Sequence, residues 1–452
     1  MVWQNGDHHH IPAEHKVLKA GGWFPADHRV HKKWLKAQVD EVDKNPRKLV
    51  PVLQEFKDFI ENNQRIRMLF TQMWTEVSTK KPYNKDPTGH RVIKDYGHML
   101  SVLNHIFTRA PEWTDSAETV GMVGVPMCAI FDYAMATPSG HAAFLDPDVN
   151  KMLKKILNVW GAYLQSPESA HVLGNDKLGW FGPHATHDVM EVANAPYETS
   201  HKFEDFYVCD PSKPKYGFKS WDDFFTRQVR EEARPIASPD DDNVIANACE
   251  SRPFAIAHNV KFRDHFWIKG QPYSIRDMLA GDDEAPKFAG GTVYQAFLSA
   301  LSYHRWHSPV SGTVKKAYVV DGTYFSEPLY SNSEGEINGA EQQAEIKQGI
   351  SSVQAYLSAL AARAIILIEA DNPAIGLMAF IGIGMDEVST CEITVKEGQH
   401  IKKGDQTGMF HFGGSTHCLL FRKGVEVEGF PEPGQKNNIP VRSQVAVVKT
   451  DD

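Results

Sequence analysis

Cysteine is scarce in this sequence, and so are basic charge and long apolar runs. The five cysteines are odd in number and show no Cys-x-x-Cys spacing, so neither a disulfide framework nor a zinc site is indicated. The net charge of −9 argues against nucleic acid or an anionic membrane as the main partner. The longest apolar run, 374–385, is too short and too rich in glycine to cross a bilayer, and no targeting signal is recognised. We therefore expect a soluble protein of the cytoplasm.

The first part of the chain has the periodicity of amphipathic helices. Apolar residues recur there at spacings of three and four. The stripes are Leu35, Val39 and Val42; Leu53, Phe56 and Ile60; Ile66, Leu69, Phe70, Met73 and Val77; Met99, Leu103, Ile106 and Phe107; and Met152, Leu153, Ile156, Leu157, Trp160 and Leu164. We expect a polar arm over 1–26, to whose histidine tract we assign no function, and a helical domain over 27–195. A proline-containing linker is expected over 196–219.

The second part, 220–452, has short β-type runs separated by glycine. Runs of β-branched and apolar residues between turn residues predict strands. The expected strands are 313–320, 364–369, 375–383, 391–395 and 441–448. The fold class is therefore α+β, with a helical N-terminal domain followed by a mainly antiparallel β domain.

A Gly-Ser pair close to the C-terminus can carry unusual chemistry. Gly414 leaves its peptide carbonyl uncovered and permits backbone conformations that a larger residue could not adopt. If a base removes the hydroxyl proton, Ser415 can attack that carbonyl and convert the amide to an ester. Elimination would then break the chain and leave a ketone at residue 415. The alternative is a simple Gly-Gly-Ser turn between strands.

Four blocks in chain order resemble the phosphatidylserine decarboxylase family of self-cleaving, pyruvoyl-dependent enzymes. They are 220–227 (SWDDFFTR) with 233–236 (ARPI), 267–270 (WIKG) with 273–274 (YS), 303–314 (YHRWHSPVSGTV), and 398–416, which ends in GGST. The resemblance implies cleavage between Gly414 and Ser415 and a covalent pyruvoyl group made from Ser415. It also implies that no pyridoxal phosphate and no metal are needed, and that the large and small chains stay associated.

The resemblance also implies which side chains assist the cleavage. His307 occupies the position of the family's base for self-cleavage, and His304 a supporting position. Histidine suits the task because its ordinary pKa is near neutral. Glu250, within Ala-Cys-Glu-Ser at 248–251, stands where the family has an aspartate, and we expect its carboxylate to accept a hydrogen bond from the His307 imidazole.

A narrower resemblance is to the soluble fungal L-tryptophan decarboxylases of indole-alkaloid (psilocybin-type) pathways. It is carried by 248–251, 303–307, 361–363, 368–372, 375–377 and 409–415. It implies decarboxylation of a free aromatic L-amino acid, tryptophan first, to the amine. Two alternatives remain: phosphatidylserine as the substrate, and a non-catalytic binding module, because 308–323 and 395–405 each resemble a lipoyl-type hairpin without its Asp-Lys tip.

Overall fold

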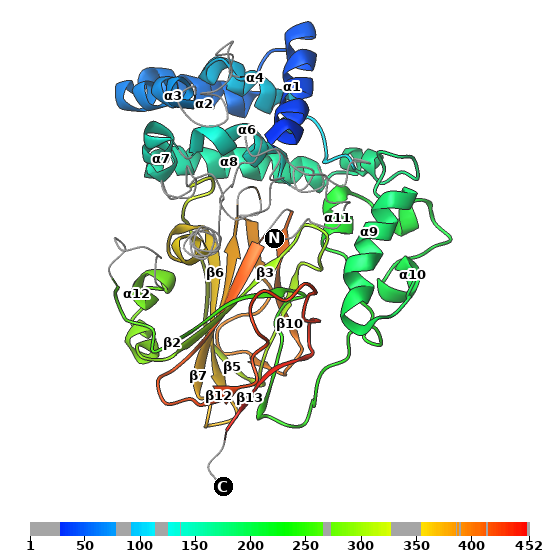
Figure 1. Cartoon of the computed structure of the whole chain (residues 1–452), viewed down its shortest axis with the longest axis vertical. Helices are drawn as coiled ribbons and strands as arrows, with labels where there is room; N and C mark the ends of the chain where they lie inside the picture. The colour runs from blue at the N-terminus through cyan, green and yellow to red at the C-terminus, as the bar shows by residue number, and fades with distance from the viewer. Residues whose placement is uncertain are drawn as a thin grey trace, which may run out of the picture.

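The structure is a computed structural model that describes residues 28–77, 92–113, 125–135, 137–264, 273–326, 354–385, 387, 390–412 and 415–449. The expected arm at 1–26, the block at 267–270 and the glycines Gly413 and Gly414 lie outside the described residues. Helices from the N-terminal part form a layer over one end of a β-rich body, and α9 and α10 run down its side (Figure 1).

The helices confirm the five predicted stripes and add others. Their bounds are α1 (His28–Lys44), α2 (Pro51–Asn62), α3 (Gln64–Val77), α4 (Tyr96–Phe107), α6 (Pro126–Met135), α7 (Pro138–Leu145), α8 (Pro147–Leu164), α9 (Pro183–Asn194), α10 (Phe203–Phe206), α11 (Trp221–Phe225) and α12 (Ile275–Met278). Short 3₁₀ helices are η4 (Pro167–Val172), η5 (Ala195–Tyr197), η6 (Pro214–Gly217) and η7 (Ala285–Phe288). The segment 196–219, which we predicted as a linker, therefore contains α10 and η6.

Local sequence explains where several helices begin. Proline is the first residue of α2, α7, α8 and α9, where its fixed φ suits the first turn and its missing N–H is not needed. The Asp146 carboxylate caps α8 by accepting from the backbone N–H groups of Asp148 and Val149. None of the described helices is both long and apolar enough to cross a membrane.

The strands form three sheets in which all pairings between named strands are antiparallel. The largest has the order β2-β3-β11-β7-β6-β5-β9, and the smaller ones are β4-β10-β8 and β1-β13-β12. The bounds are β1 (Val244–Ala246), β2 (Arg252–His258), β3 (Thr292–Leu298), β4 (Arg305–His307), β5 (Gly312–Val320), β6 (Arg363–Ala370), β7 (Leu377–Gly384), β8 (Thr390–Ile393), β9 (His400–Ile401), β10 (Gln406–His411), β11 (Ser415–Phe421), β12 (Val427–Glu428) and β13 (Gln444–Val448). The α+β class is confirmed.

The seven-stranded sheet is covered on both faces. One face shares a core with the helices, and the other shares a core with the two smaller sheets. Strand β11 contributes to both, because Cys418 and Leu420 face the first core while Leu419 and Phe421 face the second. All seven residues of β11 are buried, so this strand is a central element of the molecule.

Candidate active site

Ser415 is the first residue of β11 and lies between two neighbouring strands. It is opposite Leu298 of β3 and Gly384 of β7, and it is completely buried. Its hydroxyl oxygen has no hydrogen-bond partner among the described residues. A buried polar group without a partner costs about 1–3 kcal/mol, and such groups in native proteins often have a chemical role.

The residue two positions before Gly414 is held in an uncommon backbone conformation. Phe412 has a φ of +54°, which is rare for a residue with a bulky side chain. Its ring packs against Trp160 of α8 at a centroid distance of 4.7 Å, and against Trp221 and Phe225 of α11 at 6.1 and 5.7 Å. The helices thus fix the chain just upstream of the Gly-Ser bond.

His411, one residue earlier, is held between two carboxylates. Its Nδ1 lies 3.0 Å from both carboxylate oxygens of Asp222 in α11, and its Nε2 lies 2.7 Å from Glu392 Oε2 in β8. Burial opposes the charged ring, but the hydrogen bonds and charges of Asp222 and Glu392 outweigh it and raise the His411 pKa above its ordinary value. The end of β10 is therefore tied to both α11 and β8.

His307 is a neutral, fully engaged histidine. Its Nδ1 lies 2.8 Å from the Gly404 carbonyl oxygen and 3.3 Å from Arg442 Nε, and its Nε2 lies 2.9 Å from the Tyr303 hydroxyl. Burial, and secondarily the charge of Arg442, lowers the pKa of His307 to about 3. An Nδ1–H that donates to Gly404 leaves Nε2 to accept from Tyr303. His307 makes no hydrogen bond to Ser415 in this arrangement.

Glu250 is not the partner of His307, contrary to our expectation for the hydrogen bond. Its carboxylate accepts from Arg234 at 2.9 Å (Nε) and 2.6 Å (Nη2), and from the backbone N–H of Val441 at 2.8 Å. Both side chains of this ion pair are almost fully buried. A guanidinium offers two parallel charge-assisted bonds and neutralises the carboxylate, which a neutral imidazole cannot do.

His304 directly precedes β4, at the end of that strand that is closer to residue 412. Its backbone oxygen accepts from Phe410 N at 3.0 Å, and its ring stacks on Phe225 at 4.2 Å. His307 pairs instead with Gln406, at the opposite end of β10. His304 is therefore nearer than His307 to the end of β10 that leads to the Gly-Ser bond.

Sequence reasoning missed a third histidine, His417. Because side chains alternate along a strand, His417 lies on the same face of β11 as Ser415. It is fully buried, its ring lies 5.9 Å from that of Phe380 and 6.2 Å from that of Tyr294, and burial lowers its pKa to about 3. The two-residue spacing from Ser415 was the available signal.

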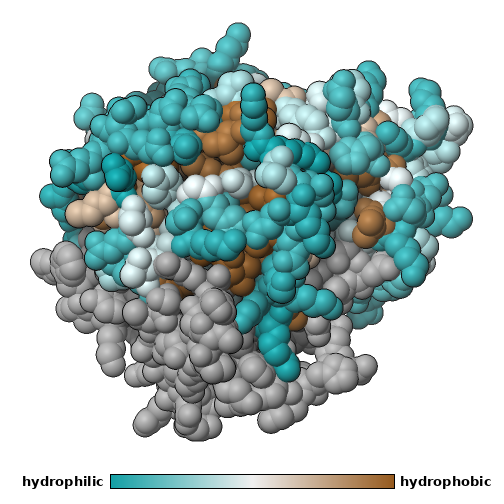
Figure 2. All heavy atoms as spheres, turned by 90° about the horizontal axis from the view of Figure 1, so that it is seen from above, coloured by the Kyte–Doolittle hydropathy of each residue, from teal (hydrophilic) through white to brown (hydrophobic). Residues whose placement is uncertain are grey.

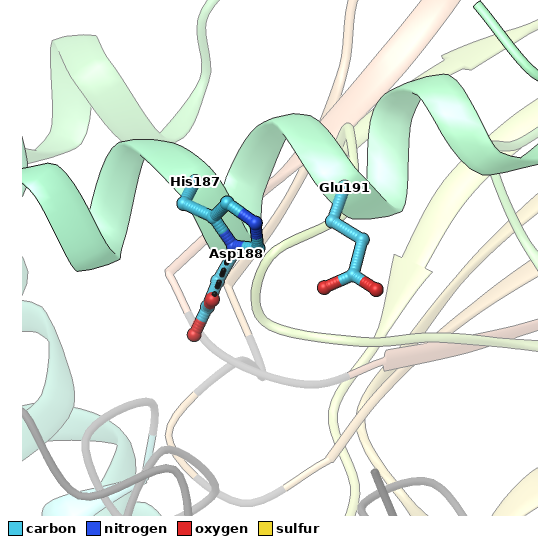
Figure 3. Close-up of side chains that lie close together, drawn as sticks. All are labelled: His187, Asp188 and Glu191. Atoms are coloured by element: carbon cyan, nitrogen blue, oxygen red, sulfur yellow. Dashed lines mark hydrogen bonds and ion pairs between the residues drawn. The ribbon is translucent and has the colours of Figure 1, made fainter.

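Three residues of α9 bring possible metal ligands together. His187, Asp188 and Glu191 have ligand atoms within 4.8 Å of one another, and Figure 3 shows them projecting from one helix. His187 and Glu191 are exposed, and His187 Nδ1 already bonds to Asp188 at 3.1 Å. Exposed acidic groups commonly lie together without an ion, so we assign no metal to this group.

Comparison with known proteins gives a consistent result. Two families described as phosphatidylserine decarboxylase match residues 50–189 and 221–443. Decarboxylase iboD of Amanita muscaria (strain Koide BX008) is 46% identical over 300 residues, which cover 66% of this chain and 84% of that protein. The L-tryptophan decarboxylases of Psilocybe cyanescens and Psilocybe cubensis are 36% and 35% identical, over 91% and 89% of this chain and 91% and 87% of their own lengths.

Proposed function

Because this chain belongs to the phosphatidylserine decarboxylase family, whose members are pyruvoyl-dependent decarboxylases, we propose that it is a proenzyme that cleaves itself between Gly414 and Ser415. The observation that carries this proposal is the buried Ser415 hydroxyl, which starts a central strand and has no hydrogen-bond partner among the described residues. A pyruvoyl group derived from Ser415 would supply a carbonyl that withdraws electrons from the substrate's α-carbon.

The strand pairing supports continued association of the two chains after cleavage. The small chain, 415–452, would contain β11, β12 and β13. Its β11 is paired along its length with β3 and β7 of the large chain, and β13 is paired with β1. Separation would remove the third of seven strands from the largest sheet, so the backbone hydrogen bonds and both cores oppose it.

His307 is the base that we propose for self-cleavage, with Glu250 as a positioning residue. His307 can accept a proton at Nε2 once the bond to the Tyr303 hydroxyl is released. Glu250 acts through the backbone, because it holds Val441 while the next residue, Arg442, contacts the His307 ring. His304 is a supporting residue next to Phe225 and the approach to the Gly-Ser bond.

The substrate that we propose is a free aromatic L-amino acid, most of all L-tryptophan, which would give tryptamine. Two relatives named L-tryptophan decarboxylase match nearly the whole chain, whereas the name of the Amanita muscaria relative gives no substrate. Hydrophilic side chains cover most of the described part of the face in Figure 2, with apolar side chains in separate small areas. A lipid substrate would be served better by a broad apolar surface at a bilayer.

The remaining expectations are proposals of the same kind. We propose a catalytic domain over 220–452 and a helical domain over 27–195. A reducing compartment such as the cytoplasm is supported by the five cysteines, none of which forms a disulfide. The alternative of a non-catalytic lipoyl-type module is not favoured, since the three relatives named above are all decarboxylases.

The test is a side-by-side assay of the purified protein with free tryptophan and with phosphatidylserine vesicles. We expect tryptamine without lipid or detergent, and mass spectrometry should find a small chain that begins with a pyruvoyl group in place of Ser415. Borohydride added with the substrate should inactivate the enzyme. Turnover of phosphatidylserine but not of tryptophan would reverse the substrate assignment, and an intact chain with full activity would refute the proenzyme.

A further inference from the structure

His411, the last residue of β10, is held by carboxylates from two other elements. Its Nδ1 lies 3.0 Å from each carboxylate oxygen of Asp222 in α11, and its Nε2 lies 2.7 Å from Glu392 Oε2 in β8. Glu392 is opposite Met409, so it is a diagonal neighbour of His411 on the same face of the sheet. The side chains of His411 and Asp222 are only 14% and 12% exposed, whereas that of Glu392 is half exposed. We call Asp222, His411 and Glu392 the carboxylate clamp.

The contacts of the carboxylate clamp determine the charge of the ring. An imidazole donates from both nitrogens only when both carry a proton, and it is then a cation. A neutral ring would turn the lone pair of one nitrogen toward a carboxylate, and that hydrogen bond would be lost. The two carboxylates also raise the pKa of His411 above its ordinary value, although burial opposes this. The arrangement is therefore that of the charged ring, with two charge-assisted hydrogen bonds.

Other titratable or charged side chains on the elements around His411 are Asp223 of α11, Cys391 of β8, Arg305 of β4 and His304, which directly precedes β4. Asp223 accepts from the backbone N–H of Lys219, and Arg305 donates to the Thr226 carbonyl oxygen and to Gln406. Burial raises the pKa of the Cys391 thiol to about 12, and the His304 ring stacks on Phe225. Asp222 and Glu392 are thus the charges that set the protonation of His411.

The residue after the carboxylate clamp has an unfavourable backbone conformation. Phe412 has a φ of +54°, in the left-handed region that a bulky residue rarely adopts. Its ring packs on Trp221 and Phe225 of α11, the same short helix that supplies Asp222 to His411. Helix α11 therefore holds residues 411 and 412 together, a short distance along the chain from the start of β11.

We propose that the carboxylate clamp positions the chain for self-cleavage, with the charged ring of His411 holding Phe412 in its left-handed conformation; this inference rests on the proposed function. His411 is a positioning residue, which takes no proton from Ser415 and forms no covalent bond, and His307 remains the base. When His411 loses its second proton, one hydrogen bond of the clamp is lost and the conformation of Phe412 is no longer maintained. Cleavage then slows, although His307 is unchanged.

The carboxylate clamp and the base predict different dependences of the cleavage rate on pH. The pKa of His307 is lowered to about 3, so this ring is neutral and able to accept a proton from about pH 6 to about pH 9. A rate that depended on the base alone would be constant over that range. The clamp is complete below the raised pKa of His411 and opens as the pH rises through it. We expect cleavage to slow by roughly 10- to 100-fold toward the alkaline end, because a displacement of about 1 Å can cost about 100-fold.

Two substitutions of His411 separate its charge from its packing. Full-length precursor is made by brief cell-free translation and transferred to buffers across this pH range, and its cleavage is followed on denaturing gels. His411→Gln keeps hydrogen-bonding groups without the charge, so it should be cut slowly at every pH and show no alkaline decline. His411→Lys keeps a positive charge up to about pH 10, so its rate should stay constant where the wild-type rate falls. A role in packing alone would leave the shape of the pH profile unchanged.

The matched control is His400→Gln, which makes the same change in an exposed histidine that lies 2.8 Å from Asp371. It should keep the wild-type rate and pH profile. Asp222→Asn should move the decline to lower pH, and by more than Glu392→Gln does, because Asp222 is the more buried partner. If His411→Gln does not fold, as judged by a cooperative thermal transition, Asp222→Asn and His411→Lys decide.

The outcomes distinguish this inference from the proposed function. A wild-type rate that is constant over the range, or an alkaline decline that persists unchanged in His411→Gln or His411→Lys, would overturn the role of the carboxylate clamp. Equal slowing in His400→Gln would have the same consequence. Absence of cleavage in the wild type at every pH would instead refute the proposed function itself.

Discussion

The two faces of strand β11 are equally buried, but their polar groups differ in whether they have hydrogen-bond partners. On the face toward the helices, the Thr416 hydroxyl donates to the Ala296 carbonyl at 2.9 Å and accepts from Gln295 Nε2 at 3.1 Å. Gln295 is held in turn by the Tyr273 hydroxyl. On the other face, neither Ser415 nor His417 has a hydrogen-bond partner among the described residues.

This difference distinguishes a hydrogen-bonded polar network from buried polar groups that have no partner among the described residues. A satisfied buried network fixes a single arrangement and adds to stability, whereas an unsatisfied group keeps its lone pairs available and costs stability. Under the proposed function, the adjacent residues Ser415 and Thr416 have different roles, one reactive and one structural, and the alternation of side chains along β11 places them on opposite faces. The following experiments test that division, beginning with the largest expected effect.

The first experiment compares the hydroxyl groups of the two faces. Ser415→Ala should remain one uncut chain without decarboxylase activity, because the nucleophile is absent. Thr416→Val should still be cut, but its free energy of unfolding should fall by about 1–3 kcal/mol because Gln295 loses a buried partner. Denaturing gels and urea titrations measure the two effects. Cleavage of the Ser415→Ala chain at the same bond would contradict the assignment.

His307→Ala should slow cleavage by about 10²- to 10⁴-fold, the contribution of a positioned general base. The time course of the uncut band measures this effect. His400→Ala is the control, since that histidine is exposed and pairs with Asp371 on the surface. Equal rates for the two variants would remove His307 from the reaction.

The Arg234–Glu250 pair should matter more for stability than for the first chemical step. Arg234→Leu leaves a buried carboxylate without its counter-ion, which costs about 3–5 kcal/mol. Glu250→Gln should lower the free energy of unfolding less than Arg234→Leu does. It should also slow cleavage, because Glu250 holds Val441 and the next residue, Arg442, contacts His307. A surface pair, Lys57–Glu61, offers the control, because Lys57→Ala should leave the urea midpoint almost unchanged. An unchanged midpoint in Arg234→Leu would show that the buried pair is unimportant.

Acid should destabilise the protein through the two neutral histidines. His307 and His417 have folded pKa values lowered to about 3 by burial, so the unfolded state binds more protons between that value and the ordinary pKa of about 6.5. Stability should therefore decrease as the pH falls from about 6.5 toward 3. His417→Gln should flatten part of this slope in urea titrations at several pH values. An identical slope in that variant would mean that His417 is not a buried neutral histidine.

The smallest effect should have the opposite sign and come from His411. Its pKa is raised in the folded state by Asp222 and Glu392, despite burial. Its stabilising contribution is present below the ordinary pKa of about 6.5 and is lost as the pH rises through the raised value. Asp222→Asn should remove most of this dependence above neutral pH. Thermal denaturation of the Ser415→Ala precursor measures it without interference from cleavage.

Much of this protein could be predicted from the order of its residues. The helical stripes predicted α1, α2, α3, α4 and α8, because the buried face of an amphipathic helix appears in the sequence as apolar residues three and four positions apart. The nearly all-buried α6 was missed, since a helix that is apolar all round has no stripe. The ordered blocks that end in Gly414-Ser415 were enough to indicate the family, which the comparisons confirm.

Tertiary structure decided which side chains meet. Glu250 was expected to bond to His307, but Arg234, sixteen residues earlier, provides two charge-assisted bonds that an imidazole cannot match. His417 was overlooked because burial on both faces of β11 cannot be read from a short run of residues. Sequence fixes which groups are available along the chain. Only packing determines which buried groups obtain partners, because the partners come from strands and helices far apart in the sequence.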